Sequence, residues 1–390
     1  MNIKVFDWEE IIVEGLAKII IPKRELFIRP DGVYEPAWSP VFYNPLMEFN
    51  RNITVLVTTT YFNGKEFFFI EPLSGTGIRG IRLALESNGY GYINDVDPLS
   101  YYYMERNISL NNLRGKLVAT INEANTFLNN FTFSGIIVDY IDIDPYGSPI
   151  PFIDSAIRPL GKKALIGITA TDTGPLTCSH KQKTLRRYGV RCQKVDFSKE
   201  LGLRILLYNI AFRAASNDMV VYPLISFQHK YYYRVFLKTA RSGNESYKVM
   251  DKCSGYIVYN PENLDRKFIK EPNEVKDQGQ KTQIIGPLWI CPLGDIDFIK
   301  KVINEGIKRE YINRETIDFL EELVRETAIN QPYIRYDKLF GLHKKNMPSI
   351  NTFIELIREY GYEAYRTHFD PRGIKTNAPI EILHEIISSF

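Results

Sequence analysis

Two aspartates and a tyrosine mark the stretch of sequence best suited to chemistry. Asp142 and Asp144 lie in the run IIVDYIDIDPYGSP, and Tyr146 follows them closely. Because side chains alternate along a strand, the two carboxylates share one face of a buried strand predicted at 135–143, which ends in a turn rich in Pro and Gly. A carboxylate and an aromatic ring at the carboxyl end of such a strand suit a flat substrate that bears an amine. The ring stacks on the substrate, and the carboxylate accepts its N–H.

A structural interpretation of the same stretch is equally open. In it, Asp144 caps the following helix and Tyr146 fills a gap in the packing. Asp142 either orients its neighbour or serves as a cap, and for this residue we favour the cap. The choice for the whole stretch depends on whether the rest of the chain supplies a cofactor.

A glycine turn and two acidic residues predict a cofactor site at the same edge of the sheet. The turn 74–77 reads SGTG and precedes a predicted helix, so its backbone amides can meet the carboxylate of a ligand. Asp95 ends the second strand, where an acid binds ribose hydroxyls, and Glu123 ends the third, where it can accept an adenine amino group. Arg51 and Arg79 could pair with a ligand carboxylate, although each alone is more often structural. A complete GxGxxG motif is absent, so the pattern predicts S-adenosylmethionine rather than a dinucleotide.

Alternating strands and helices must position these residues. Strands are predicted at 67–72, 90–96, 116–121, 135–143, 164–169, 219–227 and 232–238. Helices are predicted at 53–61, 78–86, 99–110, 152–158 and 199–215. The last two strands are separated by only a few residues, as in an antiparallel pair. This order predicts an α/β fold with a mostly parallel, Rossmann-like doubly wound sheet, as in class I S-adenosylmethionine-dependent methyltransferases.

The chain is long enough for two domains. Residues 1–245 are predicted to form the methyltransferase domain with an N-terminal arm, and 240–252 is read as an irregular boundary rich in polar residues. Residues 246–390 are predicted to form a smaller α+β domain. Its short strands, its helices and its polar, hairpin-like tail have the outline of a winged helix-turn-helix.

Composition limits the classes of protein that fit. The net charge of +3 over 390 residues is too small to prove a polyanionic partner, so any basic surface is local. The four cysteines, at positions 178, 192, 253 and 291, show no zinc spacing, and no disulfide framework is expected, which favours a reducing compartment. The sequence shows neither a signal peptide nor an apolar run long enough to span a membrane. We therefore expect a cytoplasmic protein with no metal and no membrane contact.

A basic run follows the fifth predicted strand. It contains no acidic residue and comprises Lys181, Lys183, Arg186, Arg187, Arg191 and Lys194. Such a run is commonly the solvated face of a helix. Because this one lies at the edge where the chemistry is predicted, we favour contact with phosphates.

Several short motifs extend over nearly the whole chain. They are SPVFYNP (39–45), NR (50–51), SGTGIRG (74–80), ND (94–95), EAN (123–125), DIDPYGSP (142–149), TATD (169–172), RRY (186–188), GPLW (286–289), YRTHF (365–369) and GIKT (373–376). In these motifs the chain resembles the tRNA (guanine-26-N2)-dimethyltransferase family of archaea and eukaryotes. The resemblance implies two transfers of a methyl group from S-adenosylmethionine to N2 of guanine 26 in tRNA. Because it continues through residues 246–390, it also implies that this C-terminal domain interacts with tRNA.

The resemblance also implies roles for individual residues. It assigns the cofactor to Arg51, Arg79, Asp95, Glu123 and Ala124, and the glycine turn described above adds Gly75 and Gly77. It makes Asp144 the catalytic residue, with Phe42 and Tyr146 lining the guanine pocket. Tyr146 replaces a more usual Phe, and Glu123 a more usual Asp, and both replacements keep the chemistry of the position. Some relatives carry paired cysteines for zinc, and the absence of such pairs here argues against a metal.

The chemistry of the target agrees with these roles. A guanine amino group is a poor nucleophile because its lone pair is delocalised, and a carboxylate that accepts its N–H can take the proton as the methyl transfers. The base must first be flipped out of the tRNA stack. Two alternatives remain open: methylation of an adenine amino group in DNA, and a nucleic-acid-binding protein built on an inactive methyltransferase fold.

Overall fold

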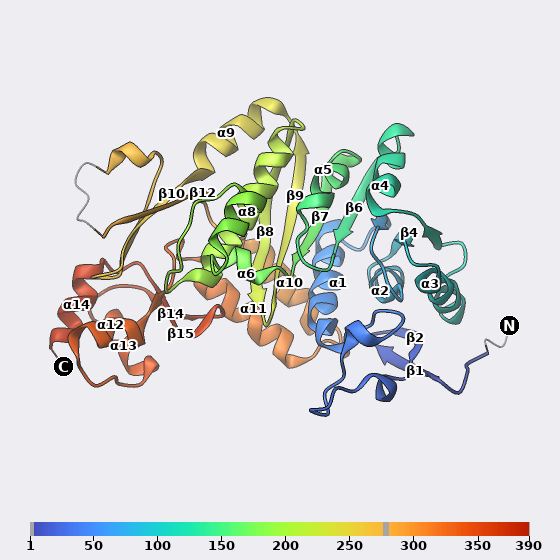
Figure 1. Cartoon of the computed structure of the whole chain (residues 1–390), viewed down its shortest axis with the longest axis horizontal. Helices are drawn as coiled ribbons and strands as arrows, with labels where there is room; N and C mark the ends of the chain where they lie inside the picture. Colours follow the sequence, from blue (N-terminus) through green and yellow to red (C-terminus); the bar gives the residue numbers. More distant parts are fainter. Residues whose placement is uncertain (1–3, 276–280, 390) are drawn as a thin grey trace.

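The computed structural model describes residues 4–275 and 281–389, and a seven-stranded sheet lies at its centre (Figure 1). The strand order is β5-β4-β3-β6-β7-β9-β8, in which β9 runs antiparallel to both neighbours and the other pairs are parallel. The predicted doubly wound sheet, with its antiparallel pair, is therefore confirmed. Its strands are β3 (Phe67–Glu71), β4 (Gly89–Asp95), β5 (Leu117–Ile121), β6 (Val138–Ile143), β7 (Leu160–Ala170), β8 (Met219–His229) and β9 (Tyr232–Arg241).

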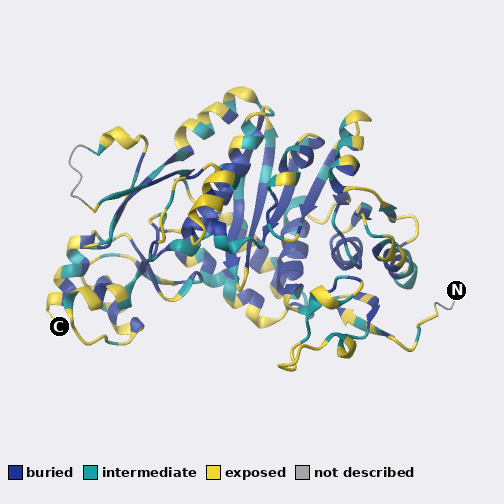
Figure 2. Cartoon of the chain, in the orientation of Figure 1, coloured by how far each residue is buried: buried dark blue, intermediate teal, exposed yellow. Residues whose placement is uncertain are grey.

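Helices cover both faces of this sheet, because successive residues of its central strands are apolar on opposite sides. Ile141 and Ile143 of β6 pack with α4, α5 and α8, whereas Tyr140 packs with α1, α2 and α3. Figure 2 shows how completely the strands are buried between these layers. The helices are α1 (Glu48–Phe62), α2 (Ile78–Glu86), α3 (Pro98–Leu110), α4 (Ala124–Phe133), α5 (Ile150–Ile157), α6 (Thr173–Leu176), α7 (Lys181–Tyr188) and α8 (Ser198–Ala215).

An N-terminal hairpin of β1 (Glu9–Glu14) and β2 (Ala17–Pro22) packs against α2 and α3. Buried ion pairs hold it there. Glu14 Oε1 lies 2.6 Å from Arg51 Nε of α1 and 2.9 Å from Arg82 Nη1 of α2. The pairing joins the hairpin to both helices and lowers the pKa of Glu14 to about 2, because the two guanidiniums outweigh the effect of burial.

Two small sheets and several helices form the C-terminal part. The first sheet has the order β11-β10-β12, and the second has the order β13-β15-β14. Helix, short strand, two helices and a hairpin follow one another from α11 to β15, in agreement with the winged-helix outline. The elements are α9 (Gly243–Cys253), β10 (Ser254–Asn260), β11 (Asp265–Ile269), β12 (Gln283–Trp289), α10 (Ile296–Ile307), α11 (Arg314–Thr327), β13 (Ile334–Arg335), α12 (Tyr336–His343), α13 (Ile350–Glu359), β14 (Ala364–Thr367), β15 (Asp370–Thr376) and α14 (Ile380–Ser388).

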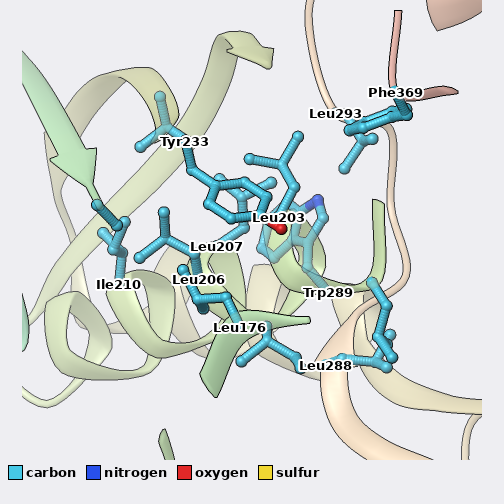
Figure 3. Close-up of a cluster of buried hydrophobic side chains, with 14 of the residues drawn as sticks. Leu176, Leu203, Leu206, Leu207, Ile210, Tyr233, Leu288, Trp289, Leu293 and Phe369 are labelled. Atoms are coloured by element: carbon cyan, nitrogen blue, oxygen red, sulfur yellow. The ribbon is translucent and has the colours of Figure 1, made fainter. Parts of the chain in front are cut away.

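The apolar core continues from the large sheet into this C-terminal part. Trp289, Leu293 and Phe369 belong to one buried cluster with Leu203 of α8 and Tyr233 of β9 (Figure 3). On the other face of the sheet, α10 and α11 lie against α1. The division into residues 1–245 and 246–390 stays a prediction, and the two parts share their core.

The predicted irregular boundary at 240–252 is wrong, because these residues contain most of helix α9. The Ser242 side chain caps it, and the Glu245 N–H donates to Ser242 Oγ over 3.2 Å. Ser followed three residues later by Glu is a sequence signal for the start of a helix. The polar composition of the segment hides that signal.

Two disulfide bonds contradict the expectation that the cysteines stay unpaired. Cys178 is bonded to Cys192 and Cys253 to Cys291, with Cα–Cα distances of 6.0 and 5.0 Å. Cysteine spacing could not reveal these pairs because the fold brings them together. The first bond closes the segment that contains α7, and the second joins the end of α9 to the chain after β12.

Within the described ranges, no helix is both long and apolar enough to cross a membrane. The same residues contain no group of three or more His, Cys, Asp or Glu side chains that could hold a metal ion.

Candidate active site

The turn after β6 projects from the carboxyl edge of the sheet and is held on both sides. Gly147 has φ of +84°, which favours glycine, and its N–H donates to Thr171 Oγ1 over 2.6 Å. The Thr171 N–H donates back to the Gly147 carbonyl over 2.8 Å. Ser148 Oγ lies 3.0 Å from the Tyr188 hydroxyl of α7. The turn that carries Asp144 and Tyr146 is therefore fixed by the β7 loop and by α7.

Asp144 pairs with Arg79, a buried arginine that three carboxylates share. Arg79 Nε lies 3.3 Å from Glu71 Oε1 and 3.4 Å from Asp142 Oδ1, and one terminal nitrogen contacts Asp144. The other terminal nitrogen donates to Asn50 Oδ1 over 2.9 Å. The Asp144 side chain is 18% exposed and that of Asp142 is 0% exposed. Asp144 is thus the carboxylate of this group that a substrate can reach.

Asp142 is buried beneath the site, where it contacts groups of the protein itself. Its carboxylate accepts from Arg234 Nη1 over 3.0 Å and from the Tyr140 hydroxyl. Burial alone would raise the pKa of Asp142, but Arg234 and Arg79 keep it below its usual value. The N-cap of the next helix, α5, is Pro149, with no side-chain cap. The capping role that we favoured for Asp142 is therefore wrong, and neither aspartate caps this helix.

Glu71 completes a charge cluster that the sequence did not point to. Three carboxylates face two arginines, so the group carries one excess negative charge when all are ionised. Burial raises the pKa of Glu71 to about 8 against the opposing effect of Arg79, and Asp142 and Asp144 add smaller upward contributions. Protonation of Glu71 neutralises the cluster.

This raised pKa predicts a pH effect on stability. Unfolded Glu71 releases its proton near pH 4.5, whereas the folded protein keeps it until about pH 8, so the folded state binds more protons in that window. The contribution of Glu71 to the free energy of unfolding should therefore fall as pH rises from about 4.5 to 8. Urea unfolding of the wild type and of Glu71→Gln at pH 5.5 and 8.5 tests this: the variant should gain stability relative to the wild type at the higher pH. Parallel pH dependence in both proteins would contradict it.

Aromatic rings form a wall beside Asp144. Phe42 and Tyr146 meet edge to face with ring centroids 4.8 Å apart, and Tyr146 is 71% exposed. Burial and the nearby Asp144 carboxylate raise the pKa of Tyr231, in the β8–β9 turn, whose hydroxyl accepts from Asn44 Nδ2 over 2.7 Å. Tyr231 was not predicted from the sequence, where its one signal is a run of three tyrosines next to a predicted hairpin turn.

The predicted cofactor residues meet at the ends of β3, β4 and β5. Gly75 and Gly77 have φ of +53° and +78°, and the Gly75 N–H donates to Asp95 Oδ2 over 2.8 Å. A Cβ on Gly75 would lie 3.0 Å from the Phe42 carbonyl oxygen, so the glycine turn borders the aromatic wall. The Glu123 side chain caps α4 by accepting from the N–H groups of Asn125 and Thr126, and its neighbour Ala124 is buried.

Arg51 and Arg79 are both buried in ion pairs with carboxylates of the protein itself, Glu14 and the Glu71–Asp142–Asp144 group. Each therefore stands beside the predicted cofactor site with its charge already partnered. The donor set as a whole fits the cofactor: acids for hydroxyl and amino groups at Asp95 and Glu123, and cations near the glycine turn for a carboxylate.

Helix α7 carries most of the basic run and connects it to the turn that carries Asp144. Arg187 Nη1 donates to Asp172 Oδ2 over 2.7 Å, and the Tyr188 hydroxyl donates to Asp172 Oδ1 over 2.8 Å. Arg187 thus has a structural partner, whereas Lys183 and Arg186 are exposed. Contact with phosphates stays a prediction for these exposed side chains.

Comparison with known proteins agrees with this geometry. A family model described as N2,N2-dimethylguanosine tRNA methyltransferase matches residues 15–388. The chain belongs to this family. The tRNA (guanine(26)-N(2))-dimethyltransferase of Metallosphaera sedula is 35% identical, over 94% of this chain and 93% of the relative, and that of Archaeoglobus fulgidus is 35% identical over 90% and 95%. Trm1 from Pyrococcus horikoshii, solved with S-adenosyl-L-methionine, matches with a TM-score of 0.84 and 30% identity over 97% of this chain and 99% of that one.

Membership of the N2,N2-dimethylguanosine tRNA methyltransferase family confirms the resemblance, the fold class and the enzyme class predicted from the sequence. The coverage is nearly complete on both sides, so the match includes the C-terminal part as well as the large sheet.

Proposed function

We propose that the chain dimethylates N2 of guanine 26 in tRNA, with Asp144 accepting the amine N–H and then its proton from a base flipped into the pocket. The observation that carries this proposal is that Asp144, the accessible carboxylate of its group, comes just before the exposed Tyr146 ring, which meets Phe42 beside the glycine turn. The family to which the chain belongs supports the reaction class.

The cofactor residues divide by chemistry. Asp95 would hold the ribose hydroxyls, Glu123 and Ala124 the adenine end, and Arg51 and Arg79 the carboxylate beside Gly75 and Gly77. S-adenosylmethionine supplies an electrophilic methyl group when it is bound. The protein then has to orient the amine and remove one proton for each transfer.

Asp144 is suited to that second task. An ionised carboxylate that accepts the amine N–H increases electron density on nitrogen and takes the proton as the new bond forms. Phe42 and Tyr146 would hold the guanine ring flat, which supplies the positioning. Asp142 cannot reach the base because it is fully buried against Arg234, so we assign it to the support of Arg79.

Flipping a stacked base costs a few kcal/mol, which contacts elsewhere on the tRNA must offset. We assign this role to the exposed basic side chains of α7, which include Lys183 but not Arg187. We also assign it to the C-terminal part, residues 246–390. The winged-helix order of its elements supports this assignment.

Nucleoside analysis of tRNA treated with the purified protein and S-adenosylmethionine tests the proposal. N2,N2-dimethylguanosine should form at position 26. A DNA duplex with adenine targets, treated in parallel, should remain unmodified. Methylated adenine would support the alternative target, and the absence of methyl transfer despite bound cofactor would support the inactive, nucleic-acid-binding alternative.

The Tyr146 ring should matter through its face rather than through its hydroxyl. Stacking of a base on an aromatic side chain contributes about 1–3 kcal/mol, so Tyr146→Ala should lower kcat/KM for tRNA by roughly one to two orders of magnitude. Tyr146→Phe should retain activity close to that of the wild type. Initial rates with labelled cofactor measure both. A loss in the Phe variant as large as that in the Ala variant would assign the hydroxyl, not the ring, to the reaction.

A further inference from the structure

A cavity of about 620 Å³ lies away from the predicted guanine pocket, where three parts of the chain meet. Lys194 comes from the segment before α8 and Lys199 from the first turn of α8. The β11-β10-β12 sheet contributes Gln283, and β13 and α12 contribute Arg335 and Lys338. The lining includes no residue of the predicted catalytic turn or of the glycine turn. The volume is in the range of sites that hold small organic molecules, and it is larger than a single phosphate needs.

The walls of this cavity are cationic. Among the residues that the structure describes, Lys194, Lys199 and Lys338 form no ion pair, and two of them, Lys194 and Lys338, are exposed. Of the acidic lining residues, Asp196 is neutralised by Arg266, with Oδ2 and Nη2 3.0 Å apart.

Two charged lining residues remain, Arg335 and Asp370. Arg335 pairs with Asp337 outside the cavity lining, and Asp370 is the acid left to oppose the three lysines. The cavity thus has a surplus of free positive charge, which attracts phosphates without reading sequence.

Gln283 adds a hydrogen-bonding requirement. Its Oε1 atom is buried and has no hydrogen-bond partner in the described part of the chain. A buried acceptor without a partner costs free energy, and a hydroxyl donor from a ligand would satisfy it. Lysines beside such an acceptor suit a ribonucleotide, because its phosphate meets the lysines and its 2′-hydroxyl can donate to the amide oxygen.

A continuous segment connects this cavity to the catalytic turn. Tyr188, at the end of α7, contacts Ser148 of that turn. Three residues later, the backbone of Arg191 pairs with Gly286 of β12, and the chain then enters the cavity wall at Lys194. Exposed basic side chains therefore line one path from the predicted guanine pocket to the cavity.

We infer that the cavity binds a ribonucleotide of the tRNA substrate other than the target guanine, with Lys199 and Lys338 on its phosphate and Gln283 on its 2′-hydroxyl. This inference rests on the proposed function, since it takes tRNA as the ligand. The contact would hold the tRNA in register while the target base is out of the stack.

The double variant Lys199→Gln/Lys338→Gln tests the phosphate contacts. Its binding to unmodified tRNA, without cofactor, is measured by fluorescence anisotropy over a range of salt concentrations. The slope of log affinity against log salt should become shallower by about one for each lost contact, and affinity at low salt should fall by about an order of magnitude. Lys162→Gln/Lys163→Gln is the matched control: both lysines are exposed at the amino end of β7, and this variant should keep the wild-type slope.

Gln283→Leu separates charge from hydrogen bonding, because it should weaken tRNA binding several-fold while the salt slope stays unchanged. A wild-type slope in Lys199→Gln/Lys338→Gln would overturn the inference. The inference would also be overturned if guanosine monophosphate bound in the cavity without competing with tRNA, because the cavity would then be a site for a small ligand. Methylation of tRNA is assayed separately. Normal methylation together with an unchanged salt slope in the lysine double variant would refute only the proposed role of the cavity. Absent methylation together with a changed salt slope would refute only the proposed reaction.

Discussion

Asp144→Asn is expected to lower methyl transfer to tRNA by roughly 10²- to 10⁴-fold, the range typical for loss of a positioned acid–base group. The amide keeps the shape of the side chain but accepts a hydrogen bond less well and cannot take the proton. Cofactor affinity should change little, because Arg79 keeps Glu71 and Asp142 as partners. Single-turnover transfer of a labelled methyl group and calorimetric binding of S-adenosylmethionine measure the two effects separately.

The same carboxylate must serve both methyl groups, so the first and second transfers should fall together in this variant. Asp154→Asn is a suitable control, because Asp154 is a 41% exposed carboxylate that pairs with Arg213 on α8. It should retain normal turnover. Near-normal turnover of Asp144→Asn would exclude Asp144 from proton removal, and the proton would have to leave by another route.

Arg234→Leu is expected to lower the free energy of unfolding by about 3–5 kcal/mol, the cost of breaking a buried ion pair from one side. Arg234 and Asp142 are both 0% exposed, and Arg234 Nη1 also lies 3.0 Å from Thr169 Oγ1. Without Arg234, Asp142 keeps only the shared Arg79 as a cation. Urea unfolding monitored by circular dichroism measures the loss.

Arg213→Leu provides the comparison for this prediction. Its ion pair with Asp154 is partly exposed, at 31% and 41%, so its removal should cost about 0–1 kcal/mol. Adding Asp142→Leu to Arg234→Leu should recover part of the lost stability, because the uncompensated charge is gone. Equal losses in Arg234→Leu and Arg213→Leu would show that the buried pair has no special weight in the fold.

The sequence was informative where local pattern decides the outcome. Short apolar runs between glycine turns predicted the strands of the large sheet, and helix α2 begins and ends where the sequence places it, at Ile78 and Glu86. Asp95 and Gly75 were expected at neighbouring strand ends, and the structure joins them by a hydrogen bond. These features depend on residues close together in the chain or on the simple rule that parallel strands end at one edge.

Features that depend on distant parts of the chain could not be read in this way. Arg234 lies on the seventh predicted strand, and no local pattern indicates that it reaches Asp142 on the fourth. Glu71 looks like an ordinary strand end until its burial among like charges is known. The disulfide partners, such as Cys253 and Cys291, are separated by 38 residues and meet only through tertiary packing.

The core shared by the large sheet and the C-terminal part fixes the distance between that part and the turn that carries Asp144. Trp289 and Phe369 are packed into the layer formed by α8 and β9, so the core of the C-terminal part is continuous with that of the large sheet. If residues 246–390 bind tRNA, the shared core fixes the distance between that contact and Asp144. Selection of guanine 26 would then follow from the length of RNA that spans this distance. A tRNA with one base pair inserted in that interval should be methylated poorly or at a shifted position.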